Sequence, residues 1–282
     1  PPPKPTATNQ VNTPNAAAST LRVMEMLETT HDQAARDVYA ETQKAMGKRT
    51  IIVSPDGLKQ CIEKYASKLP FEHVVFAENR GLGLALHDGL AACTYEIVAR
   101  VDSDDCSVPQ RFALQAEYLD QHPDISVVGG WMTEGYSLGP RSLPVLRKTP
   151  IDVAVIPQFA RRRNPLNHPT VMFRKSHILA CNSYEFCPLF EDYYLWAKML
   201  TQGYIFSNLP EVLVETDADS DYFRRRGGII YVKNELRLVK KLRRIGFLSP
   251  VEAGVFLLTR LPIRLIPIFL RQHFYKTFLR TA

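Results

Sequence analysis

The amino-acid sequence predicts an α/β fold with a mostly parallel central sheet and flanking helices. Two observations support this prediction. Short apolar runs alternate with helical patterns between residues 50 and 130, the order that parallel strands joined by crossover helices produce. One of these runs, Ile97–Val101, ends abruptly in acidic residues, and open α/β sheets bind their ligands at the carboxyl ends of strands.

The chain begins with 19 residues rich in Pro, Thr, Asn and Ala, a composition that predicts a disordered segment. From Leu21 to Met46 apolar residues recur at helical spacing, which predicts a helix. The stretch 21–27 reads Leu-Arg-Val-Met-Glu-Met-Leu and is too charged for a central parallel strand. We therefore expect the sheet to begin at the buried strand Thr50–Ser54.

Local patterns beyond that strand predict the remaining elements. Apolar runs bounded by Pro, Gly or Asp indicate strands, and helical spacing after a Pro or an acidic start indicates helices. In chain order we expect a helix at 59–68, a strand at 73–76, a loop and helix at 79–90, a strand at 97–101, a helix at 109–121, a strand at 125–130, a short helix near 150–159, a loop and strand at 164–174, a helix at 190–203, and short strands at 204–206 and 212–215.

Three carboxylates within four positions follow the strand at 97–101, in the sequence Asp102-Ser-Asp-Asp105. In an extended or turning backbone, Asp102 and Asp104 can point to the same side. Two hard oxygen ligands suit Mg²⁺ or Mn²⁺, which complete their coordination with phosphate and water. The alternative is a solvated acidic turn ahead of the helix that Pro109 opens.

A second polar segment, Asn79-Arg-Gly-Leu-Gly83, leads into a helix. Gly81 and Gly83 permit close backbone approach, and a helix N-terminus attracts anions. Leu86 occupies the place of the third glycine in a dinucleotide-binding fingerprint, so that motif is excluded. A plain turn role for both glycines stays open.

Six motifs, taken in order, resemble those of the family 2 glycosyltransferases, bacterial enzymes of GT-A-type fold that build surface polysaccharides. The resemblance extends from about Ile51 to Val214. Its motifs are Val53-Ser-Pro-Asp-Gly57, Asn79-Arg-Gly-Leu-Gly83, Ala99-Arg-Val-Asp-Ser-Asp-Asp105 with Pro109-Gln-Arg111, Val127-Val-Gly129, Asn167-His-Pro-Thr170, and Glu191-Asp-Tyr-Tyr-Leu-Trp196.

The resemblance implies a nucleotide-sugar site. Asp56 would accept a hydrogen bond from the nucleotide base, and a turn residue before Gly57 is the alternative. Asp102 would lie near the ribose or the metal, and Asp104 would coordinate the metal ion on the diphosphate. The other residues predicted to bind the nucleotide-sugar are Asn79, Arg80, Ser103, Arg224 and Arg226.

The resemblance also implies catalytic and acceptor residues. Asp192 resembles the general base, which removes the proton of the acceptor hydroxyl as it attacks the anomeric carbon. Glu191 is a second candidate, although the helix dipole also stabilises acids at a helix start. His168 is predicted to contact the acceptor, or else to be a packed structural histidine. Arg224 and Arg226 suit phosphate oxygens, or else form a solvated basic loop or a membrane contact.

One family feature has no match in the sequence. The family opens with a buried strand whose end helps to hold the nucleotide, and nothing before Ile51 resembles it. We therefore expect this first strand to be missing, through loss or truncation. Its absence would weaken both the fold and nucleotide binding.

Basic residues are concentrated towards the C-terminus. From Ile229 onwards there are eleven Lys or Arg against two acids, a charge of +9, so the whole-chain charge of +6 leaves −3 for residues 1–228. Apolar clusters alternate with these cations, and Pro262 and Pro267 argue against a spanning helix. We expect a basic amphipathic helical segment that binds a membrane surface, or else packs on the domain. Nucleic acid is not an expected partner, because no recognition motif accompanies the charge.

These predictions define three regions. Residues 1–19 are the disordered segment, residues 20–228 the catalytic domain, and residues 229–282 the basic segment. Within the catalytic domain, about 50–130 would bind the nucleotide and about 131–228 the acceptor. Five cysteines without a C-x-x-C pair suit a reducing compartment.

The predicted activity is that of an inverting, metal-dependent hexosyltransferase. It would move a sugar from a nucleotide-sugar, in the first instance a UDP-sugar, to a lipid-linked or saccharide acceptor of exopolysaccharide, capsule or lipopolysaccharide. Its place would be cytoplasmic and peripheral, on the inner face of the cytoplasmic membrane. Two alternatives stay open: a nucleotidyltransferase of related α/β architecture, and a non-catalytic family member that binds a membrane or a partner.

Overall fold

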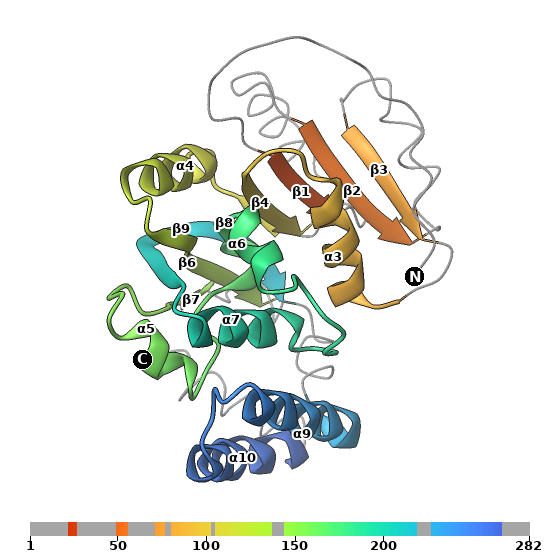
Figure 1. The fold of residues 1–282 in the computed structure, drawn as a ribbon, viewed down its shortest axis with the longest axis vertical. Helices are drawn as coiled ribbons and strands as arrows, with labels where there is room; N and C mark the ends of the chain where they lie inside the picture. The colour runs from red at the N-terminus through yellow and green to blue at the C-terminus, as the bar shows by residue number, and fades with distance from the viewer. Residues whose placement is uncertain are drawn as a thin grey trace.

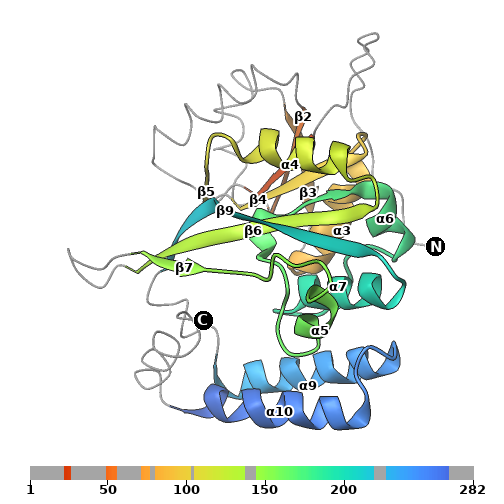
Figure 2. The ribbon, with the colours of Figure 1, turned by 90° about the vertical axis from the view of Figure 1, so that its left-hand side faces the viewer.

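The computed structural model describes residues 22–26, 49–55, 71–76, 80–102, 105–136, 144–218 and 227–266. Within these ranges the strands form one nine-stranded sheet of order β3-β2-β1-β4-β8-β6-β9-β5, with β7 paired to β6. Helices cover both faces of the sheet, and a further pair of helices lies beyond one of these layers (Figures 1 and 2). The predicted disordered segment at 1–19 and the predicted helix at 59–68 lie outside the described residues.

Four parallel strands form one half of the sheet: β1 (Arg22–Met26), β2 (Arg49–Pro55), β3 (Phe71–Phe76) and β4 (Ile97–Asp102). β1 lies between β2 and β4 and pairs with both. The prediction that the first strand is missing is therefore wrong, and so is the helix predicted to begin at Leu21. Hydropathy describes only the side chains of this stretch, two of which are charged. The position of the strand depends instead on backbone hydrogen bonds along both of its edges.

The other half contains two long strands, β6 (Ile125–Tyr136) and β9 (Ile205–Ala218), which are parallel to each other. Three short strands run antiparallel to their neighbours: β5 (Asp105–Ser107), β7 (Val145–Arg147) and β8 (Met172–Arg174). The sheet is therefore mixed, and the prediction of a mostly parallel sheet is wrong. Alternation along the sequence identifies element types, but not the direction in which a three-residue strand joins the sheet. The two strands expected at 204–206 and 212–215 are parts of β9.

Helices pack on the sheet through two apolar clusters. On one face α3 (Leu82–Ala92), α6 (Lys175–Ala180) and α7 (Glu191–Thr201) cover strand residues such as Val98 and Phe173. On the other face α4 (Arg111–Gln121) covers Ala99 and Met172. The alternation of Val98 and Ala99 between the two clusters follows the two-residue period of a strand. A short helix, α5 (Ile156–Ala160), and a 3₁₀ turn, η2 (His168–Thr170), lead into β8.

The described part of the C-terminal segment forms α9 (Gly228–Arg244) and α10 (Pro250–Leu265). A capping box between Ser249 and Glu252 starts α10, which has Pro250 in its first turn. Both helices pack over the side of α7 that faces away from the sheet, where Tyr193 and Ala197 meet their apolar residues. Helix α7 is consequently buried on two sides (Figure 2). None of the described helices is long and apolar enough to cross a membrane.

A fully buried arginine at the start of α4 holds the strand end that carries Asp102. Arg111 donates to the carbonyl of Arg100 at 2.7 Å and to the Ser107 hydroxyl at 2.9 Å. It also donates to Gln115 at 3.1 Å, and Gln115 in turn donates to the Val128 carbonyl at 2.9 Å. These contacts link α4 to β4, β5 and β6.

The substitution Arg111→Met should lower the free energy of unfolding by about 3 kcal/mol, because it leaves buried acceptors without donors. Urea denaturation measures this change. Asp120→Asn, on the exposed side of the same helix, should change the free energy by less than about 0.5 kcal/mol. Equal denaturation midpoints for wild type and Arg111→Met would contradict the bracing role.

Candidate active site

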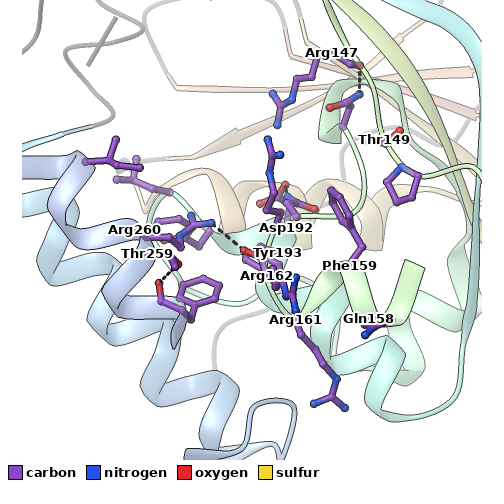
Figure 3. A pocket seen from close by; sticks show the side chains of 18 of the residues that line it. Arg147, Thr149, Gln158, Phe159, Arg161, Arg162, Asp192, Tyr193, Thr259 and Arg260 are labelled. Carbon is purple, nitrogen blue, oxygen red and sulfur yellow. Dashed lines mark hydrogen bonds between the residues drawn. The ribbon is translucent and has the colours of Figure 1, made fainter. Parts of the chain in front are cut away.

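A cleft of about 1550 Å³ opens beside the carboxyl end of β4 and the start of α7 (Figure 3). Its walls include α5, the segment after β7, and α10. Three of the predicted site residues line it: Asp102, Glu191 and Asp192. They come from two elements nearly ninety positions apart, and the fold brings these carboxylates into one cavity. Their roles remain predictions.

Helix α7 begins at the two carboxylates. Phe190 precedes it and provides no side-chain cap. The negative charges of Glu191 and Asp192 in the first turn interact favourably with the helix dipole. Asn164 donates its amide to Oδ2 of Asp192 at 2.6 Å. The Asn164 contact fixes the Asp192 carboxylate at the edge of the cleft, while Glu191 retains only 8% exposure.

Burial raises the pKa of both carboxyls. It raises the pKa of Glu191 to about 7, with a further contribution from the charge of Asp192. Burial also raises the pKa of Asp192, against the opposing effects of the Tyr193 backbone N–H, Asn164 and two arginines. A carboxylate tuned upwards in this way is a better proton acceptor near neutral pH than an ordinary one.

A buried arginine lies behind these carboxylates. Arg100 is 3% exposed, and its Nη2 pairs with Oδ1 of Asp102. Burial alone would lower its pKa, but the charge and hydrogen bond of Asp102 and the charge of Asp192 leave it raised. Two of its guanidinium nitrogens, Nε and Nη1, have no hydrogen-bond partner among the described residues. This positive charge favours the ionised form of Asp192 and so opposes the effect of burial on its pKa.

The glycines of the segment before and within α3 allow this helix to pack closely against the start of α7. Gly81 precedes α3 with φ +85°, a conformation that favours glycine. At Gly83 a side chain would come within 2.7 Å of the Glu185 carbonyl and 3.1 Å of Cβ of Glu191, so this glycine lets α3 approach the start of α7. Arg80 forms an ion pair with Asp88 and does not line the cleft.

His168 lies in a packed setting. It is 9% exposed, and its Nε2 lies 3.1 Å from the Tyr184 hydroxyl. Burial lowers its pKa well below the ordinary range, so it is neutral. These contacts favour the structural alternative, and acceptor binding by His168 stays a prediction.

The rest of the Asn167–Thr170 motif braces the sheet. Asn167 donates to the carbonyls of Gly130 at 2.9 Å and Arg147 at 3.2 Å. The backbone N–H of Gly130 donates to the Thr170 hydroxyl at 3.0 Å. The motif therefore ties η2 to β6 and to the residue that ends β7.

Several predicted residues lie outside the described part of the chain: Asp56, Asn79, Ser103, Asp104, Arg224 and Arg226. Among the described residues, no group of three His, Cys, Asp or Glu could hold a metal ion. The Asp102 carboxylate does suit a metal ion, because it is 23% exposed and lines the cleft. It pairs with Arg100 through Oδ1.

Sequence reasoning missed the residues that complete the cleft. The sequence indicates only a polar loop at Asn164 and gives no role to the cationic lining residues, which are Arg147, Lys148, Arg161, Arg162, Arg163, Arg260 and Arg264. One signal was available for Arg100, because a lone charge inside an apolar strand requires a buried partner.

Comparison with known proteins identifies the family. Residues 52–194 match the profile of glycosyl transferase family 2. An uncharacterised glycosyltransferase of Haemophilus influenzae is 38% identical over 230 residues, which cover 81% of this chain and 84% of that protein. The chain belongs to glycosyl transferase family 2.

Two further family members have more specific names. The amylovoran biosynthesis glycosyltransferase AmsE of Erwinia amylovora is 34% identical over 83% of this chain and 89% of its own length. The UDP-Gal:alpha-D-GlcNAc-diphosphoundecaprenol beta-1,3-galactosyltransferase of Escherichia coli is 29% identical over 88% of this chain and 90% of its own length. The relatives named here are glycosyltransferases, and family 2 membership supports the same class of enzyme for this chain.

The fold has solved counterparts as well. The structure of S. aureus TarS 1-349 in complex with UDP-GlcNAc superposes with a TM-score of 0.58 at 15% identity, over 93% of this chain and 76% of that one. Such similarity concerns the fold alone and confirms the predicted GT-A type of α/β architecture.

Glu191→Gln should change how stability depends on pH. The folded protein holds the Glu191 proton up to about pH 7, whereas an ordinary glutamate releases it near 4.5, so wild-type stability should fall as pH rises between these values. The glutamine variant lacks this loss and should gain roughly 2–3 kcal/mol relative to wild type between pH 4.5 and 8.

Urea denaturation at pH 4.5, 6 and 8 measures this difference. Glu117→Gln, on the exposed side of α4, serves as the matched control and should follow the wild-type pH dependence. If Glu191→Gln also follows it, the carboxyl does not titrate abnormally.

Proposed function

We propose that the chain is an inverting, metal-dependent glycosyltransferase acting on a nucleotide-sugar, in the first instance a UDP-sugar. Its acceptor is lipid-linked or a saccharide, in surface polysaccharide biosynthesis. The observation that supports this most strongly is the hydrogen-bonded carboxylate of Asp192, which lines the same cleft as Asp102 at the end of β4.

Asp192 acts as the general base. It takes the proton of the acceptor hydroxyl while that oxygen forms a bond to the anomeric carbon of the donor sugar. The bond between this carbon and the diphosphate oxygen breaks, and the nucleoside diphosphate leaves with the electron pair. Attack opposite the leaving group inverts the anomeric centre. Asn164 holds the carboxylate at 2.6 Å, and Arg100 contributes positive charge nearby.

The donor side is assigned to the β4 end and the neighbouring predicted residues. Asp102 and Asp104 would hold Mg²⁺ or Mn²⁺, which when bound offsets charge on the departing diphosphate. Asp56, Asn79, Arg80, Ser103, Arg224 and Arg226 are assigned to the nucleotide-sugar from the family resemblance. The E. coli relative named for UDP-Gal supports UDP as the nucleotide.

The membrane surface is proposed as a partner of α9 and α10. Large apolar side chains on these helices are exposed, including Ile230 at 76% and Leu258 at 77%. Exposed cations such as Lys233 and Lys240 lie on α9. Apolar residues beside cations suit the interface of an anionic bilayer and support a peripheral position on the cytoplasmic side. The relative named for a diphosphoundecaprenol acceptor supports this setting.

Two variants should separate donor binding from chemistry. UDP with Mn²⁺ should raise the melting temperature of the wild type, since a ligand of the folded state stabilises it. Asp104→Ala should abolish the rise. Asp192→Asn should keep it but lower sugar transfer by about 1000-fold, because only the base is lost.

The assay for transfer detects released nucleoside diphosphate, with a panel of UDP-sugars and a prenyl-diphospho-sugar acceptor. Asp152→Asn, an exposed aspartate ahead of α5, is the control and should transfer like wild type. Release of pyrophosphate instead would indicate nucleotidyl transfer. No thermal response to UDP or other nucleoside diphosphates would favour the non-catalytic alternative.

Leu258→Asp should reduce binding to vesicles of anionic lipid by about tenfold, because burying a leucine in the bilayer contributes about 1.5 kcal/mol or more. Co-sedimentation with phosphatidylglycerol vesicles measures the change. Leu179→Asp, at an exposed leucine of α6 with 41% exposure, should bind like wild type. Equal loss in both variants would contradict a surface formed by α9 and α10.

A further inference from the structure

The segment Arg161–Asn164 connects the proposed base with the start of α10. At one end Asn164 donates to Asp192 at 2.6 Å. At the other end Arg161 donates to both carboxylate oxygens of Glu252, at 2.9 and 3.0 Å, in the first turn of α10. Three peptide units separate the ends, a span of at most about 11 Å. Arg162 and Arg163 therefore lie between the catalytic carboxylate and an outer helix.

The protein does not neutralise every arginine that lines this part of the cleft. Arg161 has Glu252, Arg147 has Glu134 at 3.4 Å, and Arg260 and Arg264 share the fully buried Glu235. The exposed guanidinium of Arg162 lacks an ion-pair or hydrogen-bond partner among the described residues, although its own carbonyl accepts a bond from Arg260 at 3.5 Å. This part of the cleft therefore has a cation available for an anionic ligand.

Helix α10 presents an apolar stripe to the same cleft. Val251, Val255, Thr259 and Ile263 recur every four residues and all line it. Val251 is 75% exposed and Val255 is 51% exposed. The Thr259 hydroxyl donates to the Val255 carbonyl at 2.9 Å, so its hydrogen-bonding need is met within the helix. Exposed aliphatic surface beside cations suits a ligand that is both anionic and apolar.

Figure 3 shows Arg161 and Arg162 on the other side of Asp192 from Arg147. All four residues line the cleft, as does Asp102 at the end of β4. The proposed base, the cation Arg162 and the apolar stripe of α10 therefore line one cleft. A sugar attached through a diphosphate to a hydrocarbon chain offers a matching group to each of the three.

We propose that Arg162 binds the diphosphate of a lipid-linked acceptor whose hydrocarbon chain lies along Val251, Val255, Thr259 and Ile263. This assignment rests on the proposed function, because it takes Asp192 as the base for the acceptor sugar. It makes the acceptor an amphiphile with a diphosphate group rather than a free saccharide, and it makes α10 part of the acceptor site.

Calorimetric titration with farnesyl diphosphate tests the proposal. Saturating UDP and Mn²⁺ are present throughout, so that the donor site is occupied. Farnesyl diphosphate should bind at least tenfold more tightly than farnesol or inorganic pyrophosphate. Arg162→Gln should weaken its binding about tenfold, which corresponds to about 1.4 kcal/mol. Val255→Ser should weaken the binding of farnesyl diphosphate but leave the binding of pyrophosphate unchanged.

The matched control is Arg237→Gln, an exposed arginine of α9 outside the cleft, which should bind like wild type. Pyrophosphate binding as tight as farnesyl diphosphate would assign the site to free diphosphate and overturn the lipid assignment. Unchanged binding in Arg162→Gln, or no binding to wild type, would overturn the proposal. These three outcomes are distinct from failure of the proposed function, which would show as the absence of a thermal response to UDP and Mn²⁺ in wild type.

Discussion

The structure depends on burying two adjacent carboxylates at the start of α7. Ionised groups taken out of water need compensation, and each neighbouring element supplies some of it. The loop before η2 contributes Asn164, the helix contributes the Tyr193 N–H, and β4 contributes the buried charge of Arg100. The same packing that brings these groups together raises the pKa of both carboxyls, so their ionised forms lower the stability of the fold.

Helix α7 can be placed this deeply because it has an apolar layer on each side. Trp196 and Leu195 belong to the cluster against the sheet, while Tyr193 and Ala197 belong to the cluster with α9 and α10. Glu235, fully buried in α9, joins those two helices through Arg260 and Arg264 of α10. The C-terminal helices are therefore a wall of the cleft, and removing one member of this ion cluster would leave an uncompensated buried charge.

Much of the site could be predicted from local sequence. An apolar strand that ends in carboxylates indicated Asp102, and a helix that starts with two acids indicated Glu191 and Asp192. Both elements exist, and these three carboxylates line one cleft. The arginines of the cleft escaped prediction although Arg161, Arg162 and Arg163 are consecutive, because a run of cations does not indicate which cavity it will line. Arg162 and Val255 come from different elements and become neighbours of one cavity only through the packing of α5 and α10.

Local sequence was sufficient to predict the family, the element types around the motifs and the positions of the acidic residues, because these depend on side-chain chemistry within a few residues. The remaining features arise from contacts between distant segments. The charged strand β1 lies centrally because the edges of β2 and β4 both offer backbone partners, and β5, β7 and β8 make the sheet mixed through non-local pairing. Whether a cation becomes a buried brace, as Arg111 does, or an exposed cleft residue, as Arg162 does, depends on contacts between distant segments that no local pattern encodes.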